Sequence, residues 1–152
     1  MNNWYDTWGA FSWLLAEEDE ILNKVEQLIA GGADVNLQDG YGESALMFAV
    51  AQKFPKVVKR LIDAGANVNT QRKDGWTVLM VASAGGNMDV VDSLIDAGAD
   101  VNFQKEDNGF TALMYAIGNK HAQVAERLIA AGADMSLPNK DGKTVLDYIG
   151  QL

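Results

Sequence analysis

Few side chains in this sequence have the types and spacing that catalysis needs. His121 is the only histidine, and the chain has no cysteine. A general base must be oriented by a partner and must face a nucleophile, and no such pattern surrounds His121, so we expect it to be structural. The lack of cysteine excludes disulfides, thiolate zinc sites and a cysteine nucleophile. The sequence therefore predicts no catalytic residue and no enzymatic activity.

Two further motifs could in principle bind an ion or a phosphate. The run Glu17-Glu18-Asp19-Glu20 could attract a hard cation, but four consecutive acids do not converge on one point and the calcium-loop pattern is missing. We expect a solvated acidic turn there. Gly85-Gly86 lacks the preceding strand and the following Lys-Ser or Lys-Thr of a phosphate-binding loop. We therefore expect no metal and no cofactor.

The elements that hold these residues are revealed by an internal repeat. Related tetrads begin at Ser44, Thr77, Thr111 and Thr144, which are 33, 34 and 33 residues apart. A second marker keeps the same step, since Gly32-Ala33-Asp34-Val35-Asn36 has counterparts that begin at Gly65, Gly98 and Gly132. Two independent markers in register indicate a repeat architecture.

The third copy illustrates the unit that the sequence predicts. Asp74-Gly75 forms a turn, Thr77 caps a first helix that runs to about residue 84, and a second helix covers residues 88–97. Gly98 ends that helix in a left-handed conformation, and an extended finger leads to the next turn. One such copy cannot cover both of its apolar faces, so it gains stability only by stacking on a neighbour.

Three motifs in these copies resemble the ankyrin repeat family: the Gly-x-Thr-x-Leu-x-x-Ala helix start, the Val-Val-x-x-Leu-Ile second helix and the Gly-Ala-Asp-Val-Asn exit. The resemblance covers nearly the whole chain. It implies an all-α ankyrin-repeat solenoid of stacked helix-turn-helix units with hairpin-like finger loops. We divide the single domain, 1–152, into a degenerate N-terminal capping repeat (1–38), full repeats (39–71, 72–104 and 105–138) and a truncated C-terminal capping half-repeat (139–152).

Several recurring residues are expected to serve the scaffold alone. Asp and Asn accept hydrogen bonds from nearby amides, so the resemblance implies that the finger acids close turns; they are Asp34, Asp100 and Asp134. The methionines that replace the usual His are expected to pack between inner helices; they are Met47, Met80 and Met114. The extra residue within 104–108 should lengthen a loop, and the end of the stack near 122–152 should be its softest part.

The resemblance implies protein binding through the finger tips and the concave face of the inner helices. The variable positions beside the turn glycines include the aromatic residues Tyr41, Trp76 and Phe110. We expect Trp76 and Phe110 to form an exposed pair near Tyr41, because exposed aromatics dominate interface energies. Replacing both by Ala should then abolish partner capture and spare stability, unless they merely cover the preceding finger.

The expected rim of this binding face is Glu43, Arg72, Lys73, Asp74, Lys105, Glu106 and Asp107. Trp4, Tyr5 and Trp8 are expected to cap the stack.

The charge distribution narrows the class of partner. The chain carries a formal net charge of −9, and residues 1–39 contribute eight acids against Lys24 alone. Such a field repels nucleic acids and anionic lipids and favours a basic protein surface. With no targeting or membrane-spanning segment in the sequence, we expect a cytoplasmic monomer.

The functional hypothesis is a non-catalytic module that inhibits or sequesters a partner, as an immunity or self-protection protein does. Its basis is the short chain of 152 residues in which one repeat domain accounts for every residue. The alternative is a host-directed effector or a general scaffold with several partners. Fold alone does not name the partner.

Overall fold

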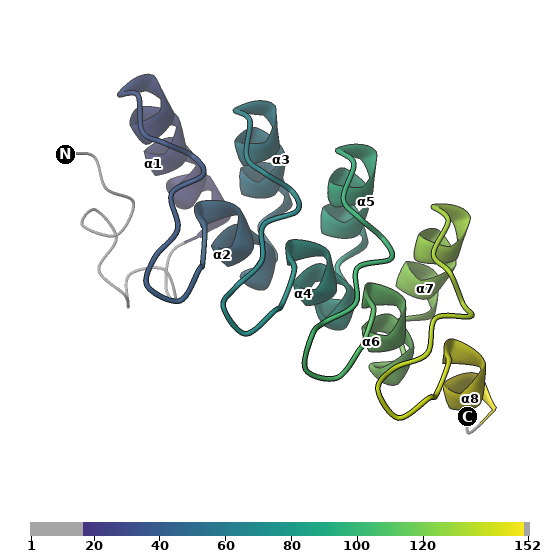
Figure 1. The fold of residues 1–152 in the computed structure, drawn as a ribbon. Helices are drawn as coiled ribbons and strands as arrows, with labels where there is room; N and C mark the ends of the chain where they lie inside the picture. Colours follow the sequence, from purple (N-terminus) through teal and green to yellow (C-terminus); the bar gives the residue numbers. More distant parts are fainter. Residues whose placement is uncertain (1–16, 151–152) are drawn as a thin grey trace.

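The structure is a computed structural model that describes residues 17–150. Over this range it confirms the all-α solenoid. Figure 1 shows two rows of helices, an outer row of α1, α3, α5 and α7 and an inner row of α2, α4, α6 and α8, joined by finger loops. The helices are α1 (Glu18–Ala30), α2 (Ala45–Ala51), α3 (Pro55–Asp63), α4 (Val78–Gly85), α5 (Met88–Asp96), α6 (Ala112–Gly118), α7 (Ala122–Ala130) and α8 (Val145–Ile149). The predicted capping residues Trp4, Tyr5 and Trp8 lie outside the described residues.

The inner helices begin at the hydroxyl residues of the repeated tetrad. Ser44 Oγ accepts a hydrogen bond from the Met47 amide, and Thr77 Oγ1 accepts one from the Met80 amide, each at 3.2 Å. Thr111 does the same in the next copy. Because a capped N-terminus satisfies an amide that has no partner within the helix, the tetrad fixes where each inner helix starts.

The acidic run near the start of the described chain is the N-cap and first turn of α1. Glu17, Asp19 and Glu20 are exposed, so the acids are solvated as predicted, within a helical turn. Glu18 Oε1 accepts hydrogen bonds from the backbone amides of Lys56 at 2.6 Å and Val57 at 3.4 Å. The first residue of α3 is Pro55, and its N-cap Phe54 offers no side-chain acceptor. The Glu18 carboxylate supplies that acceptor from the neighbouring helix, at the positive end of the α3 dipole.

The core runs along the stack between the two rows. Met47, Met80 and Met114 are all buried, so the prediction that they pack between inner helices is confirmed. The outer helices contribute buried aliphatic side chains at matched places, such as Val57, Val90 and Val124. Contacts join each inner helix to the next inner helix and each outer helix to the next outer one. Each helix pair is therefore stabilised mainly by its neighbours, as expected for a solenoid.

The base of each finger is closed by side-chain hydrogen bonds. Asp34 Oδ1 accepts from the Asn36 amide at 2.9 Å, and Asp100 and Asp134 make the matching bonds, so their predicted turn-closing role is confirmed. Asn36 has a further role that the sequence pattern did not predict. Its Oδ1 accepts from the Asn67 amide at 2.7 Å, and its Nδ2 donates to the Gly65 carbonyl at 3.1 Å. Asn69 and Asn102 make the equivalent pair of hydrogen bonds to the copies that follow them.

A candidate protein-binding face

Four aromatic rings form a continuous strip between the fingers and the inner helices. Trp76 stacks on Tyr115 with ring centroids 4.4 Å apart. Phe110 lies 5.3 Å from Tyr115 and 6.0 Å from Tyr148. Each contact joins one copy of the repeat to another or a finger to the helix that follows it. We call Trp76, Phe110, Tyr115 and Tyr148 the aromatic strip.

The tyrosine hydroxyls of the strip are held from the fingers. Asn108 Nδ2 donates a hydrogen bond to Tyr115 Oη at 3.2 Å, and Asn139 Nδ2 donates one to Tyr148 Oη at 2.8 Å. Stacking fixes the planes of the rings, and these bonds fix their rotation. The strip is therefore ordered before any partner arrives.

The strip corrects the expectation of an exposed Trp76 and Phe110 pair. Both side chains are partly buried, because they pack against Tyr115 and the edge of the core. Replacing them by Ala would remove stacking between copies and lower stability, contrary to the prediction from sequence. Tyr115 and Tyr148 are not among the aromatic residues expected at this face from the sequence. Both tyrosines occupy the fourth position after the N-cap residue of an inner helix, where the earlier copies have Phe48 and Val81. The change to Tyr at this repeated position is the sequence feature that could have indicated them.

Tyr41 is the aromatic residue that matches its predicted exposure. Its side chain is 78% exposed, the most of any large hydrophobic residue in the described part of the chain. Its backbone is held firmly, since the Lys73 amide donates to the Tyr41 carbonyl at 3.0 Å and the Tyr41 amide donates to Asp39 Oδ1 at 2.8 Å. An exposed ring thus stands on a rigid finger tip.

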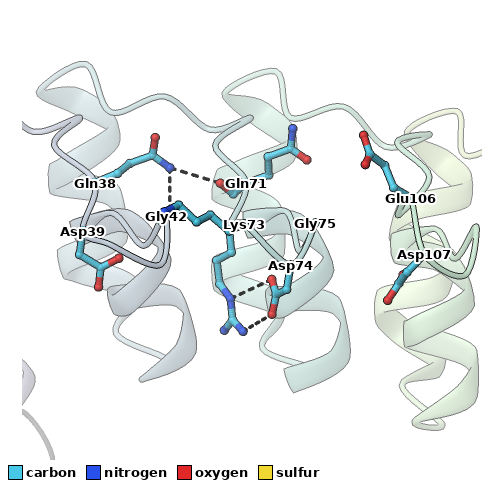
Figure 2. Close-up of a pocket in the computed structure, with 10 residues that line it drawn as sticks. Gln38, Asp39, Gly42, Gln71, Lys73, Asp74, Gly75, Glu106 and Asp107 are labelled. Atoms are coloured by element: carbon cyan, nitrogen blue, oxygen red, sulfur yellow. Dashed lines mark hydrogen bonds and ion pairs between the residues drawn. The ribbon is translucent and has the colours of Figure 1, made fainter.

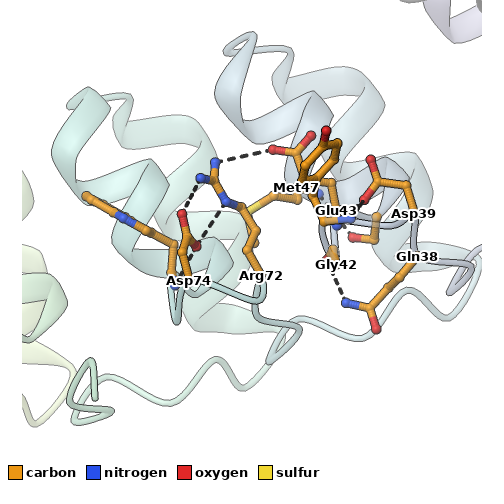
Figure 3. A network of polar contacts seen from close by, with 10 residues as sticks. Gln38, Asp39, Gly42, Glu43, Met47, Arg72 and Asp74 are labelled. Atoms are coloured by element: carbon orange, nitrogen blue, oxygen red, sulfur yellow. Dashed lines mark hydrogen bonds and ion pairs between the residues drawn. The ribbon is translucent and has the colours of Figure 1, made fainter. Parts of the chain in front are cut away.

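The predicted rim residues Glu43, Arg72 and Asp74 form one ionic network (Figure 3). Arg72 Nη1 lies 3.2 Å from Glu43 Oε1, and Arg72 Nε donates to Asp74 Oδ1 at 3.2 Å, while Nη2 pairs with Oδ2. The hydrogen bonds that Arg72 donates to Asp74 raise the pKa of Arg72 and lower the pKa of Asp74. Arg72 therefore remains charged and bridges two neighbouring fingers.

Lys105 differs from the other predicted rim residues because it is 5% exposed. Its ammonium group pairs with Asp107, which lowers the pKa of that carboxyl group, and its stem lies against Gly75. The stem fills space between two fingers, so Lys105 cannot serve as an exposed rim contact. Lys73, Glu106 and Asp107 are exposed and line a groove of about 640 Å³ (Figure 2). The groove also includes Gln38, Asp39, Gly42, Gln71, Arg72, Asp74 and Gly75.

The repeated helix pairs match a known protein family. The family model described as ankyrin repeats (3 copies) matches residues 13–105 and 86–149. The chain belongs to the ankyrin repeat family. Comparison with curated proteins gave no match. Ankyrin repeats are protein–protein interaction modules without catalytic function, so the strip and the finger tips are a candidate protein-binding face.

His121, the histidine of this ankyrin domain, makes contacts that stabilise the fold. His121 Nε2 lies 3.0 Å from the Ala84 carbonyl oxygen, and its ring lies against Gly86. Within residues 17–150, no group of three or more His, Asp or Glu side chains could hold a metal ion. No helix in the same range is long and apolar enough to span a membrane.

Proposed function

We propose that this ankyrin repeat protein binds a partner protein that has a basic surface, and that it inhibits the partner by covering that surface without chemistry of its own. The binding face comprises Tyr41, the aromatic strip and the exposed rim residues of the finger tips. The observation that carries the proposal is the exposed Tyr41, whose finger is hydrogen-bonded to the finger that carries Trp76, the first ring of the ordered aromatic strip.

The physical basis is the low entropy cost of ordered aromatic side chains. Tyr and Trp bury large areas with few rotatable bonds, and such residues supply most of the binding energy at interfaces. Here stacking and hydroxyl bonds already hold Tyr115 and Tyr148, so a partner loses little rotamer freedom by packing on them. The face offers more affinity per residue than a set of mobile side chains would.

The partner's charge follows from the acidic end of the stack. Glu17, Asp19, Glu20 and Glu26 are exposed on or beside α1, and Asp39 lies beside Tyr41 on the following finger. Some of these acids pair with Lys56 and Arg60 of α3, but the net charge of this end stays negative. A basic surface would be steered toward it, with an association rate that falls as salt is added.

The test is capture of partners on immobilised wild-type protein and on the variant Tyr41→Ala. Because Tyr41 projects into solvent, the variant should keep its stability and lose the captured partner. Ile129→Ala is the matched control, since Ile129 is an exposed apolar residue on the outer helix α7. Equal capture by wild type and Tyr41→Ala would refute this binding face.

The inhibitory role needs a separate measurement on the captured protein. Adding the ankyrin protein should reduce the partner's own activity in proportion to occupancy, because a covered surface cannot be used. Full partner activity in the saturated complex would reject inhibition and favour the scaffold alternative, which predicts a second protein bound at the same time.

A further inference from the structure

A pair formed by an acid and an arginine recurs between neighbouring outer helices. Arg60 of α3 donates from Nε to Glu26 Oε1 of α1 at 2.6 Å, and Arg127 of α7 donates from Nε to Asp92 Oδ1 of α5 at 2.6 Å. In each pair, the acid lies two residues before the buried leucine of its own helix, and the arginine lies one residue before the buried leucine of the next helix. The pair therefore links one outer helix to the next at a fixed place.

The junction between α3 and α5 shows that the two members of this pair occur together. There the position of the acid holds Lys59, and the position of the arginine holds Ser93. An arginine opposite Lys59 would meet a like charge, so the loss of the acid and the loss of the arginine are consistent with each other. Within the described stack, an acid at this position accompanies an arginine on the helix that follows.

The outer helix α7 has the acid of this pair, and no further outer helix follows it within residues 17–150. Glu126 lies two residues before the buried Leu128, is exposed, and forms no ion pair with another described residue. The helices α1, α3 and α5 each contact the next outer helix, whereas α7 lies at the end of the stack opposite α1 (Figure 1). Glu126 thus occupies the position that binds an arginine elsewhere in the stack.

An apolar groove of about 420 Å³ lies beside Glu126 at this end of the stack. Its apolar lining includes Ile117 of α6, Ala125 and Ile129 of α7, and Ile149 of α8. Ile129 is 38% exposed, whereas the matched isoleucines of α3 and α5 are partly buried against the core. Ala125 takes the place of a buried valine in α3 and α5, and the smaller side chain leaves more space in the groove. The groove therefore offers apolar surface with a carboxylate at its edge.

We propose that this groove binds an amphipathic helix of a second partner protein, and that an arginine of that helix pairs with Glu126. The helix would take the place on α7 that α7 takes on α5. Burial of Ile129 and Ile149 would supply most of the affinity, and the ion pair would set the register of the helix. Lys120 also lines the groove, just before the start of α7, so an acid in the first turn of the bound helix would be favourable.

This binding goes beyond the proposed function and does not depend on it. Tyr41 lies on the finger between α1 and α2, and Figure 1 shows these helices at the opposite end of the stack from α7 and α8. A helix in the groove therefore leaves the finger of Tyr41 accessible.

The probe is a fluorescein-labelled peptide with the sequence of residues 120–132, because the arginine of α7 already pairs with an acid of the preceding helix. A hydrocarbon staple between the positions of Ala122 and Glu126 keeps it helical, since a free peptide of this length would be a marginal helix. Fluorescence anisotropy should show saturable binding to the full chain. The same peptide with Arg127→Glu should bind about fivefold more weakly.

Exchange of the two charges makes the result specific to Glu126. Glu126→Arg in the protein should weaken the arginine peptide and should bind the Arg127→Glu peptide more tightly than wild type does, which apolar adhesion alone cannot produce. Ile149→Ala should weaken both peptides, because it removes part of the apolar wall. Asp63→Asn, a control at an exposed acid of α3, should change neither affinity.

The absence of saturable binding, or equal binding of the arginine and glutamate peptides, would overturn the proposal. Sedimentation equilibrium of the wild-type protein tests the other occupant: a dimer that Ile149→Ala dissociates would assign the groove to a second copy and would also overturn it. The partner that binds at Tyr41 should be captured equally by wild type and Glu126→Arg, so failure of this inference is distinguishable from failure of the proposed function. Loss of that capture in Glu126→Arg would overturn the assignment of the groove to a different protein.

Discussion

At the scale of single residues, Ser83 carries an unsatisfied polar group within the described core. It is fully buried on α4, and its hydroxyl has no hydrogen-bond partner, whereas the matched positions hold Val50 and Ile117. An unsatisfied buried hydroxyl costs free energy, and Ala is also the better helix former. We predict that Ser83→Ala raises the free energy of unfolding by about 1 kcal/mol, measured by urea denaturation.

A control for Ser83 is available on the next helix. Ser93 is half exposed on α5, and its hydroxyl donates to the Asp89 carbonyl at 2.9 Å. Ser93→Ala should change the free energy of unfolding by less than about 0.5 kcal/mol, as surface substitutions usually do. A loss of stability in Ser83→Ala would mean that its hydroxyl has a partner after all.

At the scale of elements, the turn between α4 and α5 depends on the following copy. Gly86 has a φ of 73°, and a Cβ there would lie 2.5 Å from the His121 ring. Gly86→Ala should therefore lower the free energy of unfolding by roughly 1–3 kcal/mol, from the strained backbone and the clash. In a double-mutant cycle, His121→Ala should recover part of that loss, because it removes the clash. Strictly additive losses would show that the turn and His121 are not coupled.

The start of α8 gives a second prediction at this scale, which concerns pH. The backbone amide of Thr144 donates to Asp147 Oδ2 at 2.7 Å, and this bond lowers the pKa of Asp147. A carboxyl group with a lowered folded pKa stabilises the fold above its unfolded pKa of about 3.9, and that contribution is lost as pH falls through the folded value. The Tyr148 amide should therefore lose its native chemical shift below about pH 4, and Asp147→Asn should remove this pH dependence.

At the scale of the whole molecule, stability should vary along the stack because each helix pair depends on its neighbours. The inner helix α4 has five buried residues, whereas α8 has only Val145. We predict the slowest amide hydrogen exchange in α4 and α6 and the fastest in α8, measured by mass spectrometry. Uniform exchange along the stack would instead indicate a single cooperative unit.

The stacking of copies also explains which features of the fold and of the binding face could be predicted from the sequence. The repeat predicted the solenoid, the cap at Thr77 and the packing of the methionines, because each of these features recurs at the same position in successive copies. It could not place Trp76 or Lys105 correctly. The burial of Trp76 depends on Tyr115 in the next copy, and that of Lys105 depends on how the inserted residue reshapes a finger. Contacts between copies decide the details of the binding face.

The central claim is that the finger tips and the aromatic strip bind a partner protein. Its most direct test is the dissociation constant of the captured partner, measured by titration calorimetry for wild type, Tyr41→Ala and Ile129→Ala, with melting temperatures recorded for all three. We predict that Tyr41→Ala weakens binding about 30-fold, which corresponds to about 2 kcal/mol, with an unchanged melting temperature. Wild-type affinity in Tyr41→Ala, or an equal loss in Ile129→Ala, would contradict the claim.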